Sequence, residues 1–122
     1  MRRFGDLESA IMQRMWDRGA PGTVRELLDE LRETRDIAYT TVMTVMDNLY
    51  RKGWLQREPQ GRAYLYSVVA SREEYVAQVM REALDGSGDP ALALQHFVGS
   101  ISRTEAAALR RALAKAEKRT KK

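Results

Sequence analysis

Side chains that donate and accept hydrogen bonds recur at helical spacing between residues 38 and 52. At about 100° per residue, residues three and four apart share one face of an α-helix. Such a helix would have an apolar stripe made of Val42, Val45, Met46 and Leu49. The side opposite this stripe would present Thr40, Thr44, Asp47 and Arg51, and the flanks would present Thr41, Met43, Asn48 and Lys52.

This outward set has the chemistry that a nucleic-acid groove requires. Small hydroxyls allow a helix to approach closely, and they bond to phosphate oxygens or base edges, while a threonine methyl can meet a thymine methyl. Arg51 and Lys52 lie at the carboxyl end of the segment, where phosphate contacts are expected. The alternative is an exposed helix face that happens to be rich in threonine, at a small cost in helix propensity.

Catalytic and metal chemistry is poorly supported by the composition. The chain has no cysteine and one histidine, His96, so we expect neither a nucleophile–base pair nor a thiolate or multi-histidine metal site. We predict that the protein is not an enzyme and has no metal or cofactor. The acidic residues Asp29, Glu30 and Glu33 are expected to form a solvated helix face paired with Arg25 and Arg32.

The elements around residues 38–52 indicate how that helix is supported. Apolar periodicity predicts helices over about 7–18 and 24–34, with Asp6 capping the first helix and Thr23 and Glu26 forming a capping box on the second. After Gly53, two short β-favouring stretches at 54–57 and 63–68 flank a Pro-Gln-Gly turn and predict a hairpin. Three helices followed by a hairpin are the winged variant of the helix-turn-helix.

The predicted hairpin adds one basic residue to the candidate interface. Arg62 follows the turn and is placed at the tip of the wing, where it can reach a phosphate, and Tyr64 is a possible companion. For Tyr66 we expect packing against the helices. The fold class is therefore mainly α with a small β-hairpin, namely a winged helix-turn-helix over residues 1–70.

Residues 71–122 carry apolar stripes but little core of their own. The segment predicts three helices and a basic carboxyl-terminal tail, and about 50 residues of short helices cannot bury enough apolar surface alone. Pairing with a second copy would cover the stripe, so we expect a helical dimerisation domain here. The predicted dimer interface comprises Val76, Val79, Met80, Leu94, Phe97, Val98, Ile101, Leu109 and Leu113.

The overall balance of charge and hydropathy is that of an ordinary folded chain. Lys and Arg number 21 against 17 Asp and Glu, with 43% hydrophobic residues. No apolar run approaches the roughly 20 residues of a membrane span, and the basic amino terminus lacks the apolar stretch of a signal peptide. We expect a cytoplasmic protein with no membrane insertion.

The segment from residue 38 to residue 49 reads Ala38-Tyr39-Thr40-Thr41-Val42-Met43-Thr44-Val45-Met46-Asp47-Asn48-Leu49. With this block as its most specific part, the chain resembles the penicillinase-repressor (BlaI/MecI/CopY) family over essentially its whole length. The segments around Met15-Trp16, Thr23–Leu27, Phe97-Val98 and Leu109-Arg110 agree with it. The resemblance implies a winged-helix DNA-binding domain, a helical dimerisation domain, and repression of β-lactamase, resistance or copper-homeostasis genes.

Residue by residue, the resemblance implies DNA contacts from Thr40, Thr41, Met43, Thr44, Asn48 and Arg62. The copper-responsive branch senses metal through a carboxyl-terminal cysteine motif, which this chain lacks. In the β-lactam branch, a membrane sensor metalloprotease leads to cleavage between an asparagine and a phenylalanine. The corresponding bond here is His96–Phe97, so the chain departs from that pattern at the residue before the cut.

Taken together, the sequence predicts a homodimeric transcriptional repressor that binds a palindromic double-stranded DNA operator. Two alternatives stay open at this point. One is a regulator that senses a ligand in a pocket between its two halves. The other is a winged helix that binds proteins instead of DNA.

Overall fold

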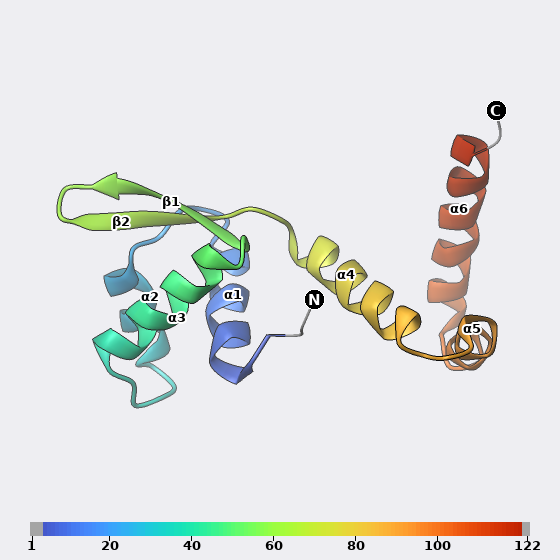
Figure 1. Cartoon of the computed structure of the whole chain (residues 1–122), viewed down its shortest axis with the longest axis horizontal. Coiled ribbons are helices and arrows are strands. Elements are labelled where there is room, and N and C mark those ends of the chain that lie inside the picture. The colour runs from blue at the N-terminus through green and yellow to red at the C-terminus, as the bar shows by residue number, and fades with distance from the viewer. Residues whose placement is uncertain (1–3, 121–122) are drawn as a thin grey trace. The chain divides into compact units, whose positions relative to one another are not determined.

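The computed structural model describes residues 4–120, and the chain divides into two compact units, Met1–Val79 and Met80–Lys122. The first unit contains three helices, a hairpin and the start of a fourth helix (Figure 1). Its elements are α1 (Asp6–Arg18), α2 (Val24–Leu31), α3 (Tyr39–Arg51), β1 (Leu55–Gln60), β2 (Ala63–Val68) and the beginning of α4 (Arg72–Asp85). This is the winged helix-turn-helix architecture, and we call residues 1–79 the winged-helix unit.

Local capping determines where the helices begin. Thr23 and Glu26 form the predicted capping box, in which the Thr23 hydroxyl accepts from the N–H of Glu26 at 3.2 Å and the Glu26 carboxylate accepts from the N–H of Thr23 at 2.9 Å. The prediction for α1 was wrong by one residue. Gly5 occupies the cap position and Asp6 is already helical, because the carboxylate of Glu8 reaches back to the N–H of Gly5 at 3.1 Å.

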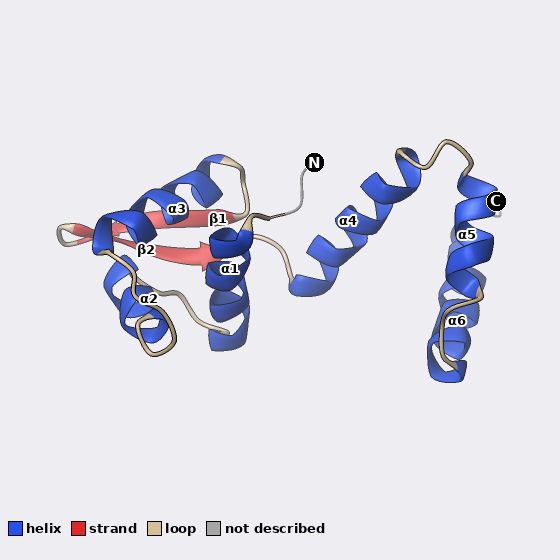
Figure 2. Ribbon diagram, turned by 90° about the horizontal axis from the view of Figure 1, so that it is seen from below, coloured by secondary structure: helices blue, strands red, loops and turns tan. Residues whose placement is uncertain are grey.

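The wing is an antiparallel hairpin with a two-residue loop. Its register runs from Leu55 opposite Val68 to Gln60 opposite Ala63 (Figure 2, red). Gly61 opens the loop with φ of +62°, a conformation that costs glycine little but strains other residues. At the base of the wing, Tyr66 exchanges two backbone hydrogen bonds of 2.8 Å with Gly22, so a single antiparallel β-bridge joins the chain before α2 to β2.

One apolar core holds these elements together. Side chains from α1, α2, α3 and the hairpin converge on it, and most of them are fully buried. The core comprises Ile11, Met12, Met15, Val24, Leu27, Leu28, Leu31, Val42, Met46, Leu49, Trp54, Leu55 and Tyr66. The packing of Tyr66 expected from the sequence is confirmed, because its side chain is only 2% exposed.

An aromatic cluster attaches the first turn of α4 to this core. Tyr75 stacks on Phe4 with ring centroids 4.1 Å apart, and it meets Trp54 edge-on at 5.1 Å. The Tyr75 hydroxyl accepts from the N–H of Phe4 at 2.9 Å. Trp16 lies within the same cluster and donates its indole N–H to the carbonyl of Ala70 at 2.9 Å. Packing of these four aromatic rings against one another makes the start of α4 part of the winged-helix unit.

The second unit, which we call the C-terminal unit, contains the end of α4 together with α5 (Pro90–Val98) and α6 (Arg103–Thr120). Asp89 caps α5 by accepting from the N–H of Leu92 at 3.2 Å, and Ser102 and Glu105 form a capping box on α6. In contrast to the first unit, no side chain between residues 80 and 119 is buried. Across the helices of residues 4–120, none is both long and apolar enough to span a membrane.

Candidate nucleic-acid interface

The two sides of α3 differ sharply in exposure. Val42, Met46 and Leu49 are fully buried against the core, while Val45 is half-buried. The stripe predicted from helical periodicity is therefore the inward side of the helix. Its burial determines which side chains of α3 face the solvent.

The residues predicted to read DNA all lie on the solvent side. Met43, for example, is 42% exposed although it is apolar. We call this set the reading face, and it comprises the exposed residues Thr40, Thr41, Met43, Thr44, Asn48 and Arg51. Their hydroxyl, amide, thioether and guanidinium groups provide the donors, acceptors and apolar surface by which a helix discriminates base pairs in a major groove.

Asp47 is the member of the outward set that another element of the protein covers. Its angular position faces away from the core, but its side chain is only 30% exposed, because Arg57 of β1 covers it. Arg57 Nη1 lies 2.9 Å from Asp47 Oδ1, and Arg51 Nε lies 2.9 Å from the other carboxylate oxygen. Asp47 is thus engaged by two arginines within the protein. The Arg51 side chain remains 74% exposed while making this contact.

Arg57 is a residue that the sequence argument missed. Its side chain is 20% exposed, and its guanidinium carbon lies 4.0 Å from the ring centroid of Tyr50 and 4.1 Å from that of Tyr64. Arg57 Nη1 also donates to the Tyr66 hydroxyl at 3.2 Å. Strand alternation was the available signal, because Arg57 is two residues from the buried Leu55 and therefore points to the same face of β1.

Electrostatics favour the charged form of Arg57. The hydrogen bond to the Tyr66 hydroxyl has the largest effect and raises the pKa of Arg57 above the ordinary arginine value. Burial opposes this rise, and the hydrogen bond to the Asp47 carboxylate adds to it. The guanidinium is therefore a permanent cation that is partly shielded from water. In such surroundings ion pairs are screened less than on an open surface.

The wing places its basic tip in solvent. Arg62 is exposed in the two-residue loop at the tip of the wing. The predicted turn at 59–61 was placed too early, because Pro59 and Gln60 still pair with β2 and extend the first strand beyond the predicted 54–57. Tyr64 is 43% exposed, but its ring lies against Arg57, so its aromatic face is already engaged within the protein.

The acidic residues of α2 pair differently from the prediction. Glu30 forms ion pairs with Arg18 and Arg14 of α1, not with Arg25 or Arg32. Arg25 instead lies over the ring of Tyr39, and Arg32 donates to the carbonyl of Ile37 at 3.1 Å. Packing of α2 against α1 brings the arginines of α1 closer to Glu30 than its own helical neighbours. Within residues 4–120, no group of three or more His, Asp or Glu side chains is arranged to hold a metal ion.

The predicted dimer stripe is exposed in the single chain. Met80, Leu94, Val98 and Leu113 are each about half exposed, at 52%, 48%, 50% and 54%. Val76 and Phe97 are similar, while Val79, Ile101 and Leu109 are half-buried. The His96–Phe97 bond lies near the end of α5, and both side chains are exposed.

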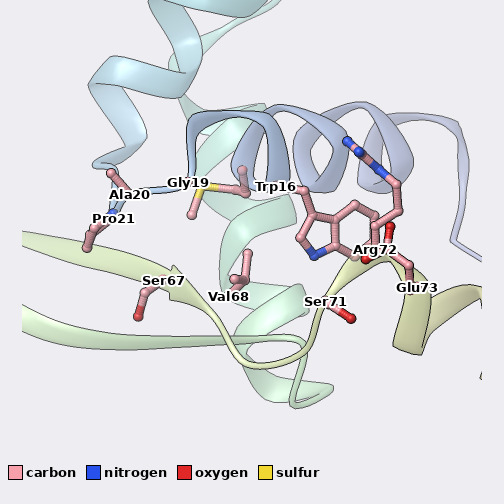
Figure 3. A pocket seen from close by; sticks show the side chains of 10 residues that line it. Trp16, Gly19, Ala20, Pro21, Ser67, Val68, Ser71, Arg72 and Glu73 are labelled. Carbon is pink, nitrogen blue, oxygen red and sulfur yellow. The ribbon is translucent and has the colours of Figure 1, made fainter.

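A pocket of about 380 Å³ lies in the winged-helix unit, near the end of α1 and the junction between β2 and α4 (Figure 3). Trp16 and Arg72 stand side by side on one wall, with the Arg72 guanidinium 5.5 Å from the indole ring centroid. The Arg72 guanidinium is already satisfied by Asp17 at 2.7 Å and Gln13 at 2.9 Å. The pocket lining is thus part apolar and part polar, with Ser67, Ser71 and Glu73 among its residues, and its one arginine is already paired.

Comparison with known proteins identifies the family. The sequence profile described as penicillinase repressor matches residues 4–115. The chain belongs to the penicillinase repressor family. The transcriptional regulator BlaI of Mycobacterium tuberculosis is 45% identical over 120 residues, which cover 96% of this chain and 87% of that protein, and sequences from two strains match equally. The resemblance drawn from the block around α3 is thus confirmed, and membership of a family of transcriptional regulators confirms that the chain is not an enzyme.

Solved structures agree on the fold. The solution structure of the DNA-binding domain of the repressor BlaI aligns with a TM-score of 0.53 at 24% identity, covering 62% of this chain and 94% of that domain. The transcriptional regulator Tm0710 from Thermotoga maritima aligns with a TM-score of 0.51 at 19% identity, covering 95% of this chain and 78% of that protein. The predicted winged-helix fold class is therefore confirmed.

Proposed function

We propose that the chain is a sequence-specific DNA-binding repressor that binds a palindromic operator as a homodimer and controls β-lactamase, antibiotic-resistance or related stress genes. The observation that carries this proposal is the composition and exposure of the reading face. An α3 helix with three buried apolar anchors holds Thr44 and Asn48 outward on a rigid support. A rigid helix with short polar side chains is the element by which helix-turn-helix proteins enter the major groove.

The homodimer is supported by the exposed stripe of the C-terminal unit. Apolar side chains that recur along helices at about half exposure mark surfaces that are covered in the working molecule. A two-fold dimer presents two copies of α3, and two-fold symmetric proteins bind two half-sites about one helical turn of DNA, or a multiple, apart. Family membership supports a repressor, because the relative with 45% identity is a transcriptional regulator.

The decisive experiment is in vitro selection with the full chain on a pool of randomised duplexes, followed by footprinting of the enriched sequence. We expect an inverted repeat with two protected half-sites. Enrichment of no sequence would contradict DNA recognition and favour a protein-binding winged helix. Enrichment of one unsymmetrical site bound by a monomer would contradict the dimeric arrangement.

Substitutions then separate reading from positioning. Thr44→Ala should change the preference at one base pair by about 1–3 kcal/mol. Arg51→Ala and Arg62→Ala should weaken binding to all duplexes alike and reduce the slope of log affinity against log salt by about one each. An unchanged preference profile for Thr44→Ala would mean that α3 does not face the bases as proposed.

For the end of repression, we propose cleavage of the His96–Phe97 bond by a membrane sensor metalloprotease system. Exposure of both side chains supports the proposal, and removal of the following helix would weaken the dimer. The bond lies in α5, so cleavage needs local opening of that helix. The test is the intact mass of the protein in producer cells treated with a β-lactam. Loss of repression with an uncut chain at unchanged abundance would favour a sensed ligand instead.

A further inference from the structure

Arg57 joins the wing to the reading helix through contacts on both elements. From α3, Asp47 and Tyr50 contact its guanidinium at 2.9 Å and 4.0 Å. From β2, the Tyr64 ring and the Tyr66 hydroxyl contact it at 4.1 Å and 3.2 Å. We call these five residues, including Arg57 itself, the Arg57 cluster.

Arg57 lies at the point along the wing where contact with the body of the unit ends. In β1, Leu55 is buried and Arg57 is half-buried, whereas every residue from 58 to 64 is exposed. The hairpin beyond Arg57 is thus a free two-stranded ribbon, and isolated ribbons of this kind are marginally stable in water. Arg57 is the last point on β1 at which the wing is held by the body of the unit before the loop that carries Arg62.

The contacts use properties that only arginine has. A planar guanidinium can stack its faces on aromatic rings while its N–H groups donate hydrogen bonds within the guanidinium plane. One arginine side chain can therefore contact Asp47, the Tyr66 hydroxyl and two tyrosine rings together. A lysine ammonium keeps the charge, but it is a compact group that cannot stack in this way. Substitution by lysine therefore tests the geometry at constant charge.

Asp47 links this cluster to the reading face. Its carboxylate is shared between Arg57, which is shielded, and Arg51, which is exposed. The charge of Asp47 is neutralised by Arg57, and the positive charge of Arg51 is left to act outward. Loss of the guanidinium at position 57 would leave Asp47 to Arg51 alone and would weaken the field that Arg51 presents to a phosphate.

We propose that Arg57 is a positioning residue for duplex recognition, which fixes the angle between the wing and α3 so that Arg62 and the reading face engage one duplex in a single register. This inference rests on the proposed DNA-binding function. It assigns to Arg57 no contact with DNA of its own. Its effect is on the preorganisation of the groups that make such contacts, because a binding site keeps its productive geometry only when supporting residues hold it.

The test compares Arg57→Lys with the matched control Arg35→Lys in the full-length protein. Arg35 also bonds an aspartate on another element, with Nη1 at 3.5 Å from Asp6 Oδ2, and it lies far along the chain from the wing. The first measurement needs no DNA, and it follows hydrogen exchange of the paired wing amides of Glu58, Gln60 and Ala63 by NMR. We expect Arg57→Lys to speed their exchange about tenfold or more, and Arg35→Lys to leave it unchanged.

The second measurement compares affinity for the selected operator with affinity for a random-sequence duplex of equal length. We expect Arg57→Lys to lower the ratio of the two affinities about tenfold while the salt slope on the random duplex stays the same. Arg57→Met should lower the ratio similarly and reduce binding to the random duplex slightly, through Arg51. Thermal unfolding of each variant checks that the unit is folded at the temperature of measurement.

Three results would overturn the inference. Wing amides that exchange as in the parent protein would show that Arg57 does not hold the wing, whatever the outcome with DNA. An unchanged affinity ratio in Arg57→Lys would show that the held angle does not matter for recognition. Equal losses on both duplexes in Arg57→Met, with the salt slope reduced by about one, would identify a direct phosphate contact instead. Failure of the parent protein to enrich any duplex would contradict the proposed function, and the exchange measurement would still decide the role of Arg57 in the wing.

Discussion

The two units of this chain use the same kinds of residue in opposite ways. In the winged-helix unit, apolar side chains from three helices and the hairpin converge until Ile11, Leu28 and Leu49 have no exposed surface. In the C-terminal unit, helices that also carry apolar residues leave Leu94 and Leu113 about half exposed. The difference shows that an apolar stripe becomes a core only when other elements of the chain can reach it.

This contrast explains where the proposed activities lie. A sealed core can hold a reading helix rigidly, and rigid elements position contacts more accurately than mobile ones. An open stripe is available to a second copy of the chain. The winged-helix unit is therefore suited to recognition and the C-terminal unit to assembly, and each can be perturbed separately.

The largest effect should come from separating the units. A fragment of residues 1–79 keeps the whole core and Tyr75, so we expect a cooperatively unfolding monomer. A fragment of residues 80–122 should lose much of its helicity at micromolar concentration and regain it as copies associate, because short helices without packing are marginal. Circular dichroism and sedimentation velocity measure both. If the fragment of residues 80–122 unfolded cooperatively as a monomer, the two units would not differ in their ability to fold alone.

A charge placed on the open stripe should have the next largest effect. Leu94→Asp should convert the dimer to a monomer, because a carboxylate cannot be buried without a partner, and it should weaken binding to a two-half-site operator by about 100-fold or more. Gln95→Asp introduces the same charge at the neighbouring exposed position and should keep the dimer. Sedimentation equilibrium distinguishes the two, and a dimeric Leu94→Asp variant would place the interface elsewhere.

Truncation of a leucine in each unit sharpens the comparison further. Leu49→Ala should destabilise the winged-helix unit by about 2–5 kcal/mol at any protein concentration, because it leaves a cavity in a closed core. Leu113→Ala should have a smaller effect that depends on concentration. Urea unfolding followed by tryptophan fluorescence measures the first effect, since Trp16 and Trp54 both lie in the winged-helix unit. Circular dichroism at several protein concentrations measures the second. Equal, concentration-independent losses would contradict the prediction.

The smallest effect concerns one ion pair within the winged-helix unit. Burial raises the pKa of Glu8, but hydrogen bonds from the Lys52 ammonium and the Gly5 N–H outweigh it, so the pKa lies below the ordinary value of 4.5. The carboxylate thus stabilises the fold above pH 4.5, and this contribution disappears as the pH falls through the lowered pKa.

We expect Glu8→Gln to destabilise the parent protein by at most about 1 kcal/mol near neutral pH, because the Lys52 side chain is exposed. The difference should vanish in acid, when Glu8 is protonated. Urea unfolding of both proteins across the acidic range measures it, and a difference that grows as the pH falls would have the wrong sign for this pair.

Much of the local structure followed from residue patterns. The capping box of Thr23 and Glu26 placed the start of α2, and the apolar spacing of α3 correctly separated its buried side from its exposed side. The turn residues around Gly61 placed Arg62 at the wing tip. These features depend on backbone geometry within one element or between two neighbouring strands, and that geometry repeats from protein to protein.

Contacts between elements were harder to infer. Helical angle alone placed Asp47 on the open side of α3, and it gave no sign that β1 would cover it with Arg57. Glu30 has arginines nearby on its own helix, yet it pairs with Arg14 and Arg18 across the α1–α2 packing. Tyr75 belongs to a helix assigned to the second half by its pattern, yet it packs among Phe4, Trp16 and Trp54.

The sequence by itself determined the order of the helices and the hairpin, the side of α3 that faces outward, and the family. These could be inferred because periodicity, capping and motif identity depend on residues that are close together in the chain. Only the tertiary structure decided which charges are satisfied within the protein and which remain available. The reason is physical, since an ion pair or a ring stack depends on a few ångströms between side chains whose separation is set by how whole elements cross. For this chain, that crossing binds Asp47 to Arg57 and leaves Thr44, Asn48 and Arg62 facing solvent.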